Sequence, residues 1–114
     1  MTSRKAKPGS ERDVQRRAII FLRKRKWLVI NTSGAWRSAR GMAGVTDLIC
    51  HFQGVTIYIE CKGFGVENLR PAQKKFHKRI IPYLGLTLVW MLVNDKNYPK
   101  FEDQIRRIEN DNCF

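Results

Sequence analysis

The sequence predicts a single α/β domain. Its 114 residues are enough for one hydrophobic core but too few for two, so a multidomain enzyme is excluded. Hydrophobic residues make up 43% of the chain, which indicates a folded protein rather than a basic disordered one. Segments with apolar residues at helical spacing alternate with short runs rich in β-branched residues. The expected order is one helix, three strands, a helix, a strand and a closing helix.

The N-terminal part of the chain predicts a tail, a helix and a strand. Residues 1–9 have basic side chains and no apolar periodicity, which indicates a flexible tail, and a single domain is expected over residues 10–114. Apolar residues at helical spacing predict a helix over residues 11–25. A short β-rich run predicts a strand over residues 27–30, which ends in turn residues.

Two β-rich runs in the middle of the chain predict a hairpin. The runs cover residues 45–52 and 55–61, and Gln53-Gly54 between them is typical of a two-residue turn. In the resulting antiparallel register, Asp47 lies directly opposite Glu60 on one face. The other face is apolar and is expected to form core, with Leu48, Cys50, Phe52, Val55, Ile57 and Ile59.

The C-terminal half predicts the remaining three elements. Pro71 is suited to the first position of a helix, and the apolar residues after it predict a helix over residues 71–81. The continuous apolar run 86–93 predicts a strand buried on both faces. A closing helix is expected over residues 99–109.

The opposed carboxylates of Asp47 and Glu60 indicate a cation between them. Two like charges about 5 Å apart repel by roughly 3 kcal/mol at an effective dielectric constant of 20. Magnesium is bound by one or two carboxylates together with waters and phosphate oxygens, so it fits this position. Lys62 lies on the same face, roughly 6.6 Å further along the strand. Two carboxylates and a lysine suit phosphodiester hydrolysis. The alternative is that both carboxylates are solvated strand-end charges and that Lys62 pairs with one of them.

Four short motifs in order resemble the virus-type replication-repair nuclease (VRR-NUC) family of the PD-(D/E)xK nuclease superfamily. The resemblance covers residues 10–93. Its motifs are a first helix with Ser10-Glu11 through Gln15, the glycine-rich segment Gly41 to Ile49 around Asp47, the segment Ile59-Glu60-Cys61-Lys62, and Leu69-Arg70-Pro71-Ala72-Gln73. Two positions depart from the family pattern. Thr46 replaces the usual proline, and Arg70 replaces a serine that would cap the helix.

The resemblance implies a restriction-endonuclease-like fold and a metal-dependent endodeoxyribonuclease. The implied fold is an αβββαβ core with a mixed sheet flanked by helices, followed by the C-terminal helix. One or two magnesium or manganese ions would be bound by Glu11, Asp47, Glu60 and the backbone carbonyl of Cys61. Lys62 would be catalytic with Asp47 and Glu60, and Gln73 would support them. Members of the family cleave branched DNA such as four-way junctions or flaps, and compact stand-alone members are expected to form homodimers.

Net charge favours a nucleic-acid partner. The chain has 22 Lys and Arg against 10 Asp and Glu, a net charge of +12. Basic side chains on the two flanking helices are candidates for contact with DNA, although exposed basic residues also serve to solvate a helix. An aromatic and basic loop over residues 34–44 could stack on bases or could serve local packing. The candidate DNA-binding residues are Arg12, Arg16, Trp36, Arg37, Arg40, Lys74, Lys75 and Lys78.

Other functions and locations remain as alternatives or exclusions. A non-catalytic nucleic-acid-binding module explains the charge but not the opposed carboxylates, and a nicking or restriction-type nuclease of the same superfamily would need further elements for base readout. The spacing of the two histidines and three cysteines predicts no zinc site. No apolar run is long enough for a membrane span, and the odd number of cysteines favours a reducing cytoplasm. The virus-type resemblance implies the cytoplasm of a bacterium that carries a phage or prophage.

Overall fold

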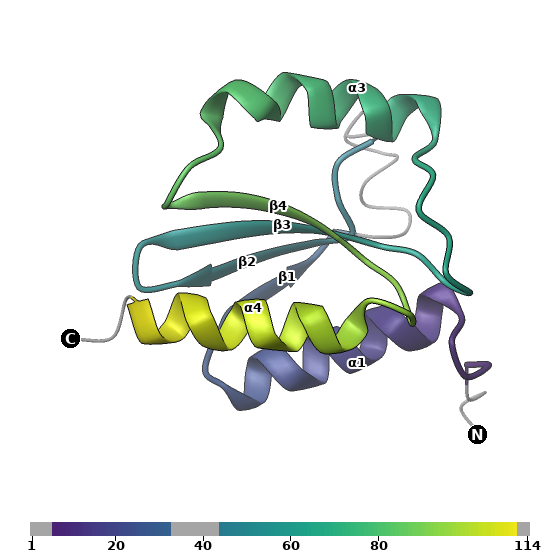
Figure 1. Ribbon diagram of the computed structural model, residues 1–114, viewed down its shortest axis with the longest axis horizontal. Helices are drawn as coiled ribbons and strands as arrows, with labels where there is room; N and C mark the ends of the chain where they lie inside the picture. The colour runs from purple at the N-terminus through teal and green to yellow at the C-terminus, as the bar shows by residue number, and fades with distance from the viewer. Residues whose placement is uncertain (1–5, 33–43, 112–114) are drawn as a thin grey trace.

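The computed structural model describes residues 6–32 and 44–111 and has the α/β architecture shown in Figure 1. Three α-helices and a short 3-10 helix are described, namely α1 (Glu11–Lys24), α3 (Pro71–Ile80), η1 (Ile81–Tyr83) and α4 (Tyr98–Asp111). The strands are β1 (Leu28–Asn31), β2 (Leu48–Phe52), β3 (Val55–Cys61) and β4 (Leu88–Val93). They form one four-stranded mixed sheet in the order β1-β2-β3-β4. The order of elements in the sequence matches the prediction.

The central hairpin has the register that the two-residue turn predicts. β2 and β3 are antiparallel and pair from Leu48 with Ile59 to Phe52 with Val55. Gln53 and Gly54 both have positive φ angles, 44° and 84°, as a type I′ turn requires. β1 pairs with β2 antiparallel, whereas β3 pairs with β4 parallel, so the sheet is mixed.

The start of β2 differs from the prediction. The strand begins at Leu48 rather than at residue 45, so Asp47 lies in a bend just before it. The reason is that the carboxylate of Asp47 takes the place of a backbone partner: its Oδ2 accepts a hydrogen bond from the backbone N–H of Cys61 at 2.9 Å. The backbone carbonyl of Asp47 accepts the N–H of Thr32 at 2.8 Å. The side chain of Asp47 is therefore fixed against the end of β3.

Two layers of helix cover the sheet. α1 and α4 lie against one face and α3 lies against the other (Figure 1). The core lies between the sheet and the pair α1 and α4, and it contains the predicted apolar hairpin face, although Phe52 is only partly buried. On the opposite face, α3 contacts the sheet through rings: the Tyr58 and Phe76 centroids are 5.6 Å apart, and those of His77 and Trp90 are 4.1 Å apart.

β4 is an edge strand of the described sheet, so the prediction of a strand buried on both faces was wrong. It begins at Leu88 rather than at residue 86, and Leu86 before it is 95% exposed. Only Met91 and Val93 of the strand are buried. An uninterrupted apolar run predicts burial on both faces, but within the part of the chain that the structure describes this strand has a single paired neighbour, β3, and is partly exposed.

A partly exposed ion pair joins the end of α1 to α4. Arg25 Nε and Nη2 both donate to the carboxylate of Glu109, with the shortest distance 2.6 Å. The indole N–H of Trp27 donates to the same carboxylate at 2.9 Å. Burial opposes the ionisation of Glu109, but the hydrogen bonds from Arg25 and Trp27 outweigh it and lower the pKa of the carboxyl.

We expect Glu109→Gln to destabilise the protein by about 1–2 kcal/mol at pH 7. A carboxyl whose folded pKa is lowered stabilises the fold above its unfolded pKa, near 4.5, and this contribution is lost as the pH falls through the lower folded value. The difference between wild type and variant should therefore shrink below pH 4.5. Urea denaturation at pH 7 and at acidic pH measures the difference in unfolding free energy between wild type and variant. Asp103→Asn, in an exposed pair, is the control, and a difference that does not vary with pH would contradict the prediction.

Candidate active site

Three charged residues lie together where β2 begins and β3 ends. The hydrogen bond from the Cys61 N–H holds Asp47 beside Glu60 and Lys62, which flank Cys61 in the chain. Asp47, Glu60 and Lys62 are only 4%, 2% and 4% exposed. Solvated strand-end charges would be exposed, so the alternative interpretation of these carboxylates does not hold. Burying an acid and a base costs free energy, which such groups recover only through specific partners.

Gln73 links the acid to the base. Its Nε2 donates to Glu60 Oε2 at 3.1 Å, and its Oε1 accepts from Lys62 Nζ at 2.8 Å. Gln73 is itself buried in the first turn of α3. A single amide therefore bonds to both the Glu60 and the Lys62 side chains.

Gln73 also compensates for the absence of a serine cap on α3. Arg70 is the N-cap residue and its side chain has no hydrogen-bond acceptor, but the Oε1 atom of Gln73 accepts the backbone N–H of Arg70 at 2.8 Å. The start of α3 is thus tied to the same amide that holds Lys62. Correct placement of α3 and correct placement of the lysine depend on one side chain.

Glu11 lies at the start of α1, next to the end of β3. A Cβ atom on Gly63 would be only 2.3 Å from the backbone nitrogen of Glu11, so this glycine permits the two elements to meet. The N–H of Phe64 donates to the carbonyl of Gly9 at 2.7 Å and holds the same junction. The structure therefore brings the first helix of the predicted site to the end of the strand that contains Glu60.

The thiol of Cys61 lies close to several negatively charged side chains. Burial raises the pKa of Cys61 well above its usual value, and the charges of Asp47, Glu60 and Glu11 raise it further, in that order. Without a bound metal, the thiol therefore stays protonated at neutral pH.

The donor atoms fit a hard divalent cation bound partly by water and substrate. Among residues 6–32 and 44–111, no group of three or more His, Cys, Asp or Glu side chains is arranged to hold a metal ion. Magnesium does not require such a group, because it keeps several waters and uses one or two carboxylates together with phosphate oxygens. The two buried carboxylates of Asp47 and Glu60 supply oxygen donors of that kind.

The candidate DNA-binding residues do not gather on one element. Arg12 and Arg16 are exposed on α1, whereas Lys74, Lys75 and Lys78 are exposed on α3, across the sheet. Trp36, Arg37 and Arg40 lie outside the described residues, as does most of the predicted tail.

Sequence reasoning missed the residues that shape the loop after Lys62. Phe64 is 63% exposed and has a positive φ of 51°, which is unusual for a bulky residue. The loop is held by Asp95, whose Oδ1 accepts the Gly65 N–H at 2.6 Å, and by buried Asn94, which donates to the Val66 carbonyl at 3.1 Å. The glycines on both sides of Phe64 are the one sequence signal that could have indicated this turn.

Fold and site together define a small α/β protein with a mixed sheet and a buried acidic and lysine site at the end of its central hairpin. Comparison with protein-family models, with curated proteins and with solved structures finds no match to this chain. Among the described residues, no helix combines the length and apolar character needed to cross a membrane.

Proposed function

We propose that the protein is a metal-dependent endonuclease that hydrolyses phosphodiester bonds in branched DNA of the four-way junction or flap type. The observation that carries the proposal is the buried chain from Glu60 through Gln73 to Lys62, with Asp47 held beside it. A stable fold does not need these buried charges, since apolar residues of similar volume stabilise a core as well or better. Buried charged residues that lie together in this way are typical of a catalytic site.

Each residue has a role that follows from its position. Asp47, Glu60 and the carbonyl of Cys61 would hold magnesium or manganese, with Glu11 as a further carboxylate from α1. Such an ion supplies Lewis acidity to a phosphate oxygen and to a water. Lys62 presents an ammonium group that stabilises negative charge developing on the phosphate or orients the attacking water. Gln73 is a positioning residue, because it holds Lys62 and Glu60 through its two amide atoms.

The net charge of +12 supports a polyanionic substrate. Exposed basic residues on α1 and α3 lie on the two sides of the sheet. The candidate site is at the open end of the hairpin, where β2 begins and β3 ends. A substrate with more than one arm can contact both sides, whereas a short linear duplex contacts one. This arrangement favours branched DNA, and a homodimer would double the number of arms that are held.

The test is cleavage of labelled DNA by the purified full chain. Four-way junction, flap, linear duplex and single-stranded DNA are incubated with magnesium, with manganese or with a chelator, and binding is measured separately in calcium. The expected result is metal-dependent cutting of a branched substrate. This cleavage activity should co-elute in size-exclusion chromatography with the 13.4 kDa chain or its dimer. Tight, salt-sensitive binding without cleavage of any substrate would support a non-catalytic nucleic-acid-binding module instead. Cutting at fixed sequences in linear duplex would support a restriction-type nuclease.

A further inference from the structure

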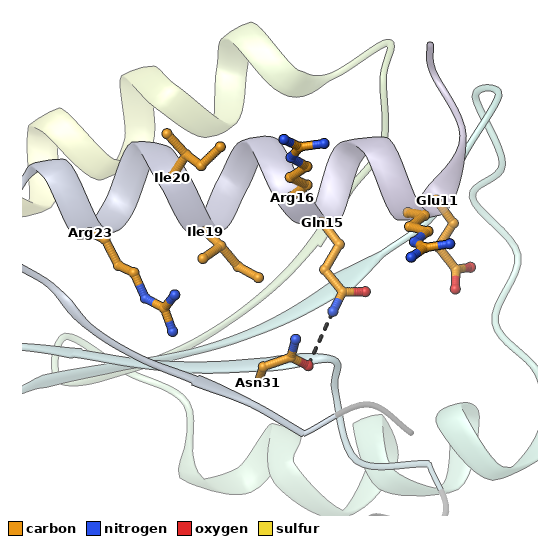
Figure 2. A pocket seen from close by; sticks show the side chains of 8 residues that line it. Glu11, Gln15, Arg16, Ile19, Ile20, Arg23 and Asn31 are labelled. Carbon is orange, nitrogen blue, oxygen red and sulfur yellow. Dashed lines mark hydrogen bonds between the residues drawn. The ribbon is translucent and has the colours of Figure 1, made fainter. Parts of the chain in front are cut away.

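A groove of about 610 Å³ runs along α1 beside the end of β1, apart from the buried charges at Glu60. Figure 2 shows the side chains of Arg23, Ile19 and Gln15 extending from α1 toward Asn31 of β1. The amide of Gln15 donates to Asn31 Oδ1 at 3.1 Å, which joins the helix to the strand across the groove. At one end the groove reaches Glu11, the first residue of α1.

Three arginines line the groove. Arg12, Arg16 and Arg23 lie four and seven residues apart in sequence, so they fall on one stripe of the helix. All three are exposed, and within residues 6–32 and 44–111 none of them is in an ion pair. Among the described residues that line the groove, the acidic one is Glu11. The stripe extends for roughly 16 Å along the helix.

Apolar side chains lie between the arginines. Ile19 is partly buried and Ile20 is 45% exposed, and both line the groove. Duplex DNA presents mainly phosphates on its outside and keeps its base faces stacked inside, so it offers little apolar surface to such a groove. A single strand exposes base faces, which bury apolar surface against the two isoleucines while basic residues bind the backbone.

We propose that this groove binds a single-stranded arm of the DNA and directs it toward the candidate site at Glu11. The inference rests on the proposed function, because the strand is taken to be part of the DNA that the site cuts. It favours flap-like substrates over four-way junctions, since only the former carry a single-stranded arm. Arg16 and Arg23 bind phosphates, and Ile19 and Ile20 contact sugars and bases.

The experiment measures binding of the full-length protein in calcium to three fluorescent DNAs: an oligothymidine, a blunt duplex and a flap. The double variant Arg16→Ala/Arg23→Ala is compared with wild type. Its matched control is Lys100→Ala/Arg107→Ala, which removes the same charge from exposed side chains on α4. We expect the groove variant to bind oligothymidine about tenfold more weakly, with a salt dependence less steep by about 1.4 in log-log slope, because each phosphate contact contributes roughly 0.7. Binding of the blunt duplex should stay within about twofold.

The outcomes separate this inference from the proposed function. An equal loss of affinity for oligothymidine and blunt duplex would overturn the assignment to a single strand, and no loss for either would overturn the groove as a nucleic-acid site. If magnesium-dependent cleavage persists in either case, the nuclease proposal stands without the groove. If the selective loss is seen but wild type cuts no DNA, the groove is supported and the nuclease proposal fails.

Discussion

Replacing Lys62 by methionine is expected to lower the rate of DNA cleavage by about 10²- to 10³-fold, the usual effect of losing one preorganised donor at a developing charge. Methionine has a length similar to that of lysine, so it fills the same space in the folded protein. Gln73 Oε1 loses the bond from Lys62 Nζ but keeps the backbone N–H of Arg70 at 2.8 Å, so it is not left unsatisfied. Single-turnover cleavage of a flap substrate measures the rate.

Binding distinguishes catalysis from recognition in this variant. Lys62 is only 4% exposed, so it contributes little to the affinity for DNA, and binding in calcium should change by no more than about threefold. Lys100→Met on α4 removes an exposed lysine and serves as the control with an unchanged rate. A rate for Lys62→Met equal to that of wild type, in a folded protein with normal binding, would remove Lys62 from the proposed mechanism.

The central hairpin was predictable from sequence because its geometry is local. A two-residue turn fixes the register of both strands, and the register places Asp47 beside Glu60 without knowledge of any other element. The structure adds what the alternation of residues does not contain. The Asp47 carboxylate accepts a hydrogen bond from a backbone N–H of β3, and the regular strand β2 therefore begins only at Leu48.

The contacts between distant segments were not predictable from periodicity or spacing. The link through Gln73 depends on how α3 lies over the sheet, which is determined by ring contacts such as that of Tyr58 with Phe76. The burial of a strand likewise depends on its position in the sheet. An apolar run has the same sequence pattern in a central strand and in an edge strand, so the partial exposure of β4 was not predicted. The groove along α1 likewise arises only when the helix lies beside Asn31.

Replacing Gly63 by alanine is expected to lower the stability by about 2–3 kcal/mol, as overpacking against atoms that cannot move aside does. The added Cβ would lie 2.3 Å from the Glu11 nitrogen and 2.6 Å from the Ser10 carbonyl carbon. Both are backbone atoms, so the end of β3 and the start of α1 must separate. The midpoint of thermal unfolding should fall by about 10 °C for a domain of this size.

Gly85→Ala is the matched control for this clash, because no atom lies within 4 Å of a Cβ built there. Its midpoint should stay close to that of wild type or rise slightly, since alanine restricts the unfolded chain. Separation of α1 from β3 also moves Glu11 away from Cys61, so Gly63→Ala should cleave DNA more slowly even at temperatures where it is folded. If Gly63→Ala and Gly85→Ala unfold at the same temperature, close contact between these two backbones does not stabilise the fold. If Gly63→Ala is destabilised but cleaves at the wild-type rate when folded, Glu11 is not part of the site.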